Sequence, residues 1–151
     1  MQLEITIDQT TLFAEVKMLS SFEGKHEYNE TGNSLYDVIK VLEQDRPLFA
    51  RYFGEAIKNI TKVLREFVAE VNANGITCVM PKSFNSAFEN DVRVAARDYV
   101  VNFSFFLYLK MRNETRAKDY LELANQDLAD IREKVYYRTK PTKKLWNGTE
   151  N

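Results

Sequence analysis

The chain has 151 residues, of which 44% are hydrophobic, 13% aromatic and 28% charged, and its formal net charge is -1. This length suits one domain that buries roughly two thirds of its unfolded surface, and the near-zero charge excludes the long-range positive field of a typical nucleic-acid or anionic-lipid binder. Cys78 is the single cysteine and His26 the single histidine, which excludes an intrachain disulfide and a zinc site built from several cysteines.

The first predicted elements are short. Leu3, Ile5 and Ile7 alternate with polar residues, and this alternation indicates an extended segment. Asp8 then offers an N-cap to a short helix. The apolar side of this helix consists of Leu12, Phe13, Val16 and Leu19.

A polar segment over residues 21–34 follows. It contains Gly24 and Gly32, so the pattern predicts an exposed loop. Ser34 can cap a second short helix over residues 35–42.

The longest predicted helix covers residues 45–72. Asp45 followed by Arg46 and Pro47 is a helix start, because proline in the first turn loses no hydrogen bond. Gly54 should cost about 1 kcal/mol relative to alanine, which indicates close packing there. The sequence NANG supplies the stop. The apolar stripe has spacings of three and four and consists of Phe49, Phe53, Ile57, Ile60, Leu64, Phe67, Val68 and Val71.

The rest of the chain predicts a connector, two antiparallel helices and a tail. Residues 76–80 alternate in the way of an extended segment, and we expect a connector here in preference to a sheet strand. Helices are predicted over 86–112 and 115–137 from their apolar stripes. The predicted fold is therefore all-α: a small helical bundle over residues 1–137, with three main helices and short N-terminal helices, and an extended basic arm over 138–151.

Residues able to do chemistry are few. His26 lies in the polar loop without an orienting partner nearby in sequence, and Cys78 in its apolar alternation is typical of a small core residue. A di-iron bundle needs histidines on its helices, and the phosphate-binding glycine loops and the hydrolase nucleophile elbow do not occur in the sequence. We therefore expect no enzymatic activity, no cofactor and no bound metal.

Basic and aromatic residues gather after residue 137. Four positive charges fall close together, Pro141 ends the helix, and an apolar pair follows. This pattern favours an arm that lays charge on an acidic neighbour and inserts one aromatic anchor into a pocket. It is also typical of a solvated terminus, and to a lesser degree of a nucleic-acid-binding segment. The residues predicted to bind a partner are Arg138, Lys140, Pro141, Lys143, Lys144, Leu145 and Trp146.

Four segments in a fixed order span most of the chain. They begin at Phe22 (FEGKHEY), Thr31 (TGNSLYD), Glu43 (EQDRPL) and Ile131 (IREKVYYRTKP). In this order, and with a last helix that leads into a basic tail, they resemble the small helical head-to-tail connector proteins of tailed bacteriophages, also called adaptor or neck-ring proteins, in particular the versions from phages of gut Bacteroidetes.

The resemblance implies a virion structural protein of the neck region, present in the host cytoplasm during assembly. About twelve copies would form a ring closed head to tail beneath the portal protein, and would link it to other neck or tail proteins. Packaged DNA would pass through the ring, without specific nucleic-acid binding and without a membrane partner. The basic tail would be an arm that reaches a neighbouring subunit.

We also expect the polar loop to lie at a subunit interface. It is too polar to be buried alone, yet it begins and ends beside apolar side chains that can act as anchors. The residues predicted for this interface are Phe22, Lys25, His26, Tyr28, Leu35 and Tyr36.

Two other classes of function stay open at this stage. One is a host-type cytosolic helical module that binds another protein without forming a ring. The other, less favoured, is a small nucleic-acid-binding protein that uses its tail and the face bearing Lys58, Lys62 and Arg65; its affinity would fall steeply with salt.

Overall fold

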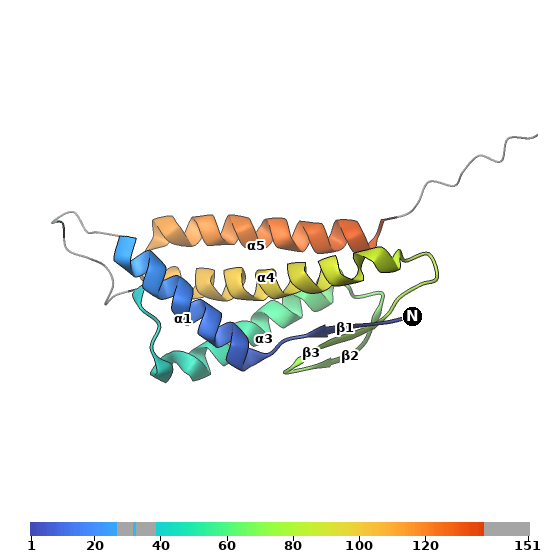
Figure 1. Ribbon diagram of the computed structural model, residues 1–151, viewed down its shortest axis with the longest axis horizontal. Coiled ribbons are helices and arrows are strands. Elements are labelled where there is room, and N and C mark those ends of the chain that lie inside the picture. The colour runs from blue at the N-terminus through green and yellow to red at the C-terminus, as the bar shows by residue number, and fades with distance from the viewer. Residues whose placement is uncertain (27–31, 33–38, 138–151) are drawn as a thin grey trace, which may run out of the picture.

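The computed structural model describes residues 1–26, 32 and 39–137. This part of the chain contains four α-helices and a three-stranded antiparallel sheet (Figure 1). The predicted all-α fold class is therefore wrong, although helices make up most of the structure. The predicted arm over 138–151 lies outside the described residues.

The sheet consists of β1 (Gln2–Thr6), β2 (Val68–Asn72) and β3 (Gly75–Val79), in the order β1-β3-β2. The extended segment predicted at the amino terminus is confirmed as β1. Residues 76–80, predicted as a connector, instead supply the central strand, and residues 68–72, predicted as the end of a helix, form an edge strand.

The helical pattern misleads in β2 because its apolar residues suit both kinds of element. Val68 lies four residues after Leu64 and Val71 three residues further on, which is helical spacing, but β-branched valines also favour strands. The two residues between β2 and β3, Ala73 and Asn74, form a hairpin turn. The sequence NANG therefore stops a strand, not a helix.

The amino-terminal strand, β1, needs the hairpin of β2 and β3 as its hydrogen-bonding partner. Leu3 and Ile5 are buried on one face of β1 and pair with Cys78 and Ile76 on β3. A lone strand leaves its backbone N–H and C=O groups without partners. β3 supplies these partners, and α1 and α3 lie between β1 and β3 in the sequence. The sheet therefore forms only through long-range pairing.

Gly75 and Gly54 play opposite parts. Gly75 begins β3 with a φ of +155°, and a Cβ placed there would come within 2.2 Å of the Ile5 carbonyl oxygen. Gly54 has no neighbouring atom within 4 Å of such a Cβ. The close approach expected at Gly54 is therefore wrong, and the tight contact between backbones occurs at Gly75.

Two of the three main predicted helices are confirmed to within three residues at each end, those over 86–112 and 115–137. The third covers only the first two thirds of 45–72. A short 3-10 turn precedes α3 and another precedes α4. The helices are α1 (Gln9–His26), α3 (Arg46–Val63), α4 (Glu89–Leu109) and α5 (Glu114–Val135).

The amino-terminal helix is longer than predicted. Asp8 caps it as expected, since its carboxylate accepts the backbone N–H groups of Thr10 (3.1 Å) and Thr11 (3.4 Å). The helix then continues to His26, so residues 21–26 are helical and not part of a loop. Of the short helix predicted over 35–42, residues 35–38 lie outside the described part, Ile39 is helical, and residues 40–42 are not.

The core lies between the helices and one face of the sheet. The central helix, α4, packs antiparallel to α5 along its length and also touches α1, α3 and β1 (Figure 1). Phe49 of α3 lies at the centre of an aromatic cluster, with ring centroids 5.7 Å from Phe13 and 5.2 Å from Tyr108. The carboxyl end of α1 thus lies at one end of an elongated bundle, and the carboxyl end of α5 lies at the other (Figure 1).

Burial of Cys78 makes folding sensitive to alkaline pH. The thiol is fully buried, and burial raises its pKa to about 11. A thiol in the unfolded chain ionises near pH 8.5, so between these values the unfolded state loses the proton first, and the stability present below pH 8.5 is lost as pH rises towards 11. We expect a loss of about 3 kcal/mol in urea unfolding between pH 8 and 11.

The matched variant is Cys78→Ala, which removes the titrating group. Its stability should be lower at pH 8 but should fall less steeply between pH 9 and 10. The difference in slope should correspond to nearly one proton released on unfolding. An unchanged slope in this variant would show that the thiol is not the group responsible.

Candidate interaction surfaces

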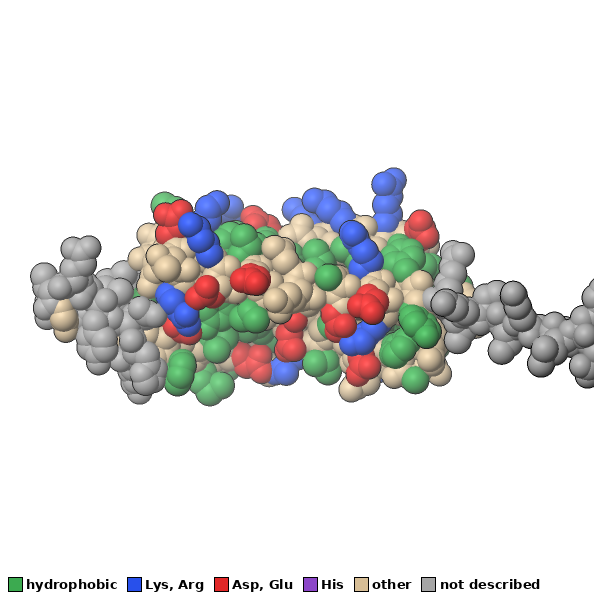
Figure 2. All heavy atoms as spheres, turned by 90° about the horizontal axis from the view of Figure 1, so that it is seen from above, with side chains coloured by type: hydrophobic (Ala, Val, Ile, Leu, Met, Phe, Trp, Pro, Cys, Tyr) green, Lys and Arg blue, Asp and Glu red, His purple; other side chains and the backbone are tan. Residues whose placement is uncertain are grey.

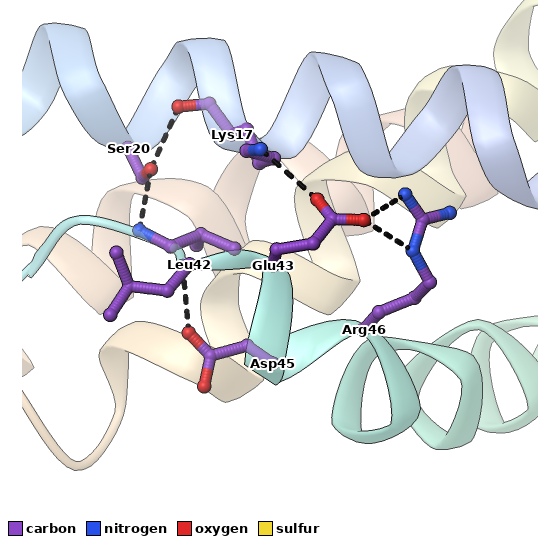
Figure 3. Close-up of polar contacts among 7 residues, drawn as sticks. Lys17, Ser20, Leu42, Glu43, Asp45 and Arg46 are labelled. Atoms are coloured by element: carbon purple, nitrogen blue, oxygen red, sulfur yellow. Dashed lines mark hydrogen bonds and ion pairs between the residues drawn. The ribbon is translucent and has the colours of Figure 1, made fainter.

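The chain re-enters the bundle beside α1 through two hydrogen bonds. The buried hydroxyl of Ser20 donates to the backbone carbonyl of Lys17 (2.8 Å) and accepts from the N–H of Val41 (2.9 Å) (Figure 3). The hydroxyl of Tyr108 on α4 donates to the carbonyl of Lys40 (3.0 Å). These contacts fix the point at which the segment after α1 returns to the core.

An exposed charge cluster lies next to this point. Glu43 pairs with the Nζ of Lys17 at 3.1 Å and accepts from the Nε of Arg46 at 2.9 Å (Figure 3). Hydrogen bonds from Arg46 and then Lys17 lower the pKa of Glu43. Asp45 accepts the N–H of Leu42 (2.9 Å) and so caps the turn before α3. Exposed pairs of this kind add little to stability, so their main effect is to orient the turn.

The other end of the same segment is held by a buried ion pair. Glu23 on α1, only 6% exposed, accepts hydrogen bonds from Arg116 Nε (3.0 Å) and Nη2 (2.6 Å) and from the hydroxyl of Tyr120 (2.9 Å). The bond to Glu23 raises the pKa of Arg116, and burial together with the same carboxylate raises that of Tyr120. Asp119 pairs with Arg116 on the solvent side (2.7 Å). The last turn of α1 is therefore fastened to the first turns of α5.

This network is not apparent from the sequence. Glu23 lies in a stretch that looks like polar loop, and Arg116 looks like an ordinary surface charge. The two residues are 93 positions apart, so no local pattern links them.

An apolar row runs along the outer side of α1. Ala14, Met18 and Phe22 follow one another at intervals of four and are all exposed, Met18 at 69% and Phe22 at 60%. We call these three residues the α1 stripe. The turn between α4 and α5 lies at the same end of the molecule as the carboxyl end of α1 (Figure 1) and exposes Met111 at 85%. Extending the amino-terminal helical pattern by one turn would have predicted the stripe from the sequence.

A small hollow lies at the opposite end, where α5 ends. Its volume is about 180 Å³, which is less than the roughly 300–1,000 Å³ of typical small-molecule sites. Two ring contacts shape its wall, Phe67 with Tyr136 (5.4 Å between centroids) and Phe88 with Tyr137 (5.5 Å). We call this site the α5-end hollow. The residues that line it are Glu66, Phe67, Pro81, Ser83, Phe84, Val135, Tyr136 and Tyr137.

Charge is mixed over most of the visible surface. Seen over α5, Lys and Arg side chains alternate with Asp and Glu, and hydrophobic side chains lie between them (Figure 2). The outer row of α3 is more basic: it presents exposed Arg51, Lys58 and Lys62, interrupted by Glu55, and exposed Arg65 follows two residues after the helix ends. The three cations on which the nucleic-acid interpretation depends, Lys58, Lys62 and Arg65, are thus all exposed to solvent.

The structure places only part of the predicted interface. Phe22 is exposed on α1, and Lys25 and His26 belong to the last turn of that helix. The other predicted residues lie outside the described part of the chain: Tyr28, Leu35, Tyr36, Arg138, Lys140, Pro141, Lys143, Lys144, Leu145 and Trp146.

Nowhere in the described ranges do three or more His, Cys, Asp or Glu side chains form a group that could hold a metal ion. None of the helices in those ranges combines the length and apolar character needed to cross a bilayer. Comparisons with protein-family models, with characterised proteins and with solved structures found no match for this chain.

Proposed function

We propose that this chain is a virion structural protein: a head-to-tail connector subunit that forms a ring under the capsid portal and links it to the tail by protein–protein contact. The observation that supports this most is the α1 stripe. A helix on the surface of a monomer normally turns a polar face to water, whereas Met18 and Phe22 are more than half exposed. Contiguous exposed apolar side chains mark interaction sites.

The arrangement of the ends also supports assembly into a ring. A ring of identical subunits needs two different patches on each copy, since each neighbour meets a different side. The carboxyl end of α1 and the α4–α5 turn lie at one end of the bundle, whereas the sheet and the end of α5 lie at the other (Figure 1). Each copy therefore offers distinct surfaces to its two neighbours.

The anchoring of the segment over 27–38 supports its proposed place at an interface. Glu23 fastens the helix that leads into it, and Val41 fastens the chain that leaves it. The two flanks of this segment are thus held on rigid elements, and interaction residues often lie on segments that a rigid scaffold holds. In the proposed ring this segment, with the exposed Phe22 beside it, contacts the neighbouring subunit or the portal.

A double substitution in the α1 stripe tests the proposal. Met18→Glu with Phe22→Glu places two charges on the apolar row, so we expect self-association and portal binding to weaken at least tenfold, a change of about 1.4 kcal/mol or more. Monomer stability should change far less than assembly, because Met18 and Phe22 are 69% and 60% exposed. Light scattering and co-sedimentation with the portal protein measure the first, and urea unfolding the second.

The matched control is Leu123→Glu on α5, which charges an apolar side chain of similar exposure (45%) outside the stripe. It should assemble normally. A double variant that assembles like the unchanged chain would contradict the proposal. An unchanged chain that stays monomeric yet binds a host protein would favour the cytosolic binding module.

The basic row on α3 favours one other candidate, a nucleic-acid-binding protein. Arg51, Lys58, Lys62 and Arg65 would contact phosphates, and binding would then weaken steeply with salt. Titration of duplex DNA at several salt concentrations measures this slope. The net charge of -1 makes this the weaker proposal, because non-specific binding depends on a long-range positive field.

A further inference from the structure

The α5-end hollow has the chemistry of a seat for one aromatic side chain. Phe84, only 9% exposed, belongs to its buried side, whereas Tyr136 and Tyr137 are 38% and 47% exposed. Aromatic rings pack favourably edge to face or offset against one another. With a volume of about 180 Å³, the hollow has room for a single large side chain and is smaller than a typical small-molecule site.

We propose that this hollow receives Trp146 from the C-terminal arm of a second copy of this chain; the inference rests on the proposed function, in which the arm binds a neighbouring subunit. Trp146 is the only tryptophan in the sequence, and Lys143 and Lys144 precede it closely. An indole gains both apolar burial and ring packing in such a site, and a single buried aromatic anchor often dominates an interface.

In this contact, charge orients the arm more than it adds to the affinity. Glu66 is an exposed acid among the lining residues and suits an arm lysine. Two exposed cations, Arg65 and Lys82, are adjacent in sequence to lining residues and oppose a purely electrostatic attraction. We therefore expect aromatic packing to supply most of the affinity. The arm lysines would lie over Glu66 and over the tyrosine rings and so orient the arm.

The position of the arm favours a second copy over the chain's own hollow. The arm begins at residue 138, directly after Tyr137, which is itself part of the hollow wall. Proline interrupts a helix that would continue from α5 and disfavours helical angles at the residue before it, so the sequence favours an extended arm around Lys140 and Pro141. To seat its own Trp146, the chain would have to reverse within eight residues and crowd its four cations together. Extended, the nine residues from 138 reach about 30 Å, which spans a subunit boundary.

Each copy thus carries one arm and one hollow. Because the arm of one copy fills the hollow of the next, the contact is head to tail, and it forms a ring when the rotation between successive copies closes.

Fluorescence of the single tryptophan tests the inference in the full-length chain. At low concentration Trp146 should emit as a solvated indole, and its emission should move to shorter wavelength as concentration rises. Ser83→Arg places a long, charged side chain at an exposed position of the hollow wall, so it should weaken the concentration-dependent shift at least tenfold. Ser83→Ala should behave like the unchanged chain, and circular dichroism checks that both variants fold.

A mixing experiment separates the arm from the seat. The Trp146→Ala chain is silent but has an open hollow, whereas the Ser83→Arg chain has a tryptophan but a blocked hollow. Adding the first to the second should shift the emission. Adding a silent chain with both substitutions should not.

Three results would overturn the inference: an emission that is already shifted and survives dilution, which means that each arm fills its own hollow; a shift that Ser83→Arg leaves intact, which places the arm elsewhere; or an indole that stays solvated throughout. None of these contradicts the connector function, which fails separately if the charged α1 stripe leaves assembly unchanged.

Discussion

Replacing Gly75 by alanine should destabilise the fold by about 3 kcal/mol, because an L side chain is strained at positive φ and its Cβ would meet the Ile5 carbonyl oxygen at 2.2 Å. That oxygen belongs to a backbone paired in the sheet, so it cannot move away cheaply. In a domain of this size, the melting temperature should fall by roughly 6–12 °C. Differential scanning calorimetry measures the change.

The matched control is Gly54→Ala, in the middle of α3. No atom lies within 4 Å of the added Cβ, and alanine is favoured over glycine in a helix, so this variant should be more stable by roughly 0.5–1 kcal/mol. If both variants behaved alike, β3 would not pass close to β1 and the sheet would be wrong. The pair therefore tests the element that the sequence did not predict.

Arg116→Ala should have a comparable effect, with a loss of about 3 kcal/mol in urea unfolding. The substitution leaves the Glu23 carboxylate, 6% exposed, without the guanidinium that balances its charge. Removing one partner of a buried pair costs roughly 3–5 kcal/mol, and the side chain of Arg116 is one-third exposed (34%), which places the effect at the lower end.

Two further variants identify the cause of that loss. Asp119→Ala removes the exposed partner of the same guanidinium and should change stability by no more than about 1 kcal/mol. Adding Glu23→Leu to Arg116→Ala removes the buried carboxylate that has lost its guanidinium partner and should recover part of the loss, a coupling visible in a double-mutant cycle. Equal losses for Arg116→Ala and Asp119→Ala would show that burial of Glu23 is not the reason.

These two tests concern opposite ends of the molecule, and both bear on how it presents its surfaces. The Glu23 network holds the end where the α1 stripe finishes, and the sheet lies at the end that contains the α5-end hollow. In the proposed ring, each neighbour would meet a different one of these ends.

The helices of the carboxyl-terminal half could be predicted from the sequence alone. The apolar stripes of α4 and α5 repeat with helical spacing over many residues, and Asn113 accepts the N–H of Arg116 (3.2 Å) where α5 begins. Periodicity and capping depend on residues within one or two turns. For the same reason Asp8 was identified as the cap of α1, and Pro47 as part of the start of α3.

The sheet, the Glu23 network and the hollow depended on tertiary structure. Val68 and Val71 satisfy a helical pattern and a strand equally well, and only pairing of the hairpin with β1, more than sixty residues earlier in the chain, selects the strand. Glu23 becomes a buried anchor only because Arg116 reaches it. Local signals report conformational preference within a few residues, whereas backbone pairing and charge burial are determined by which distant segments the collapsed chain brings together.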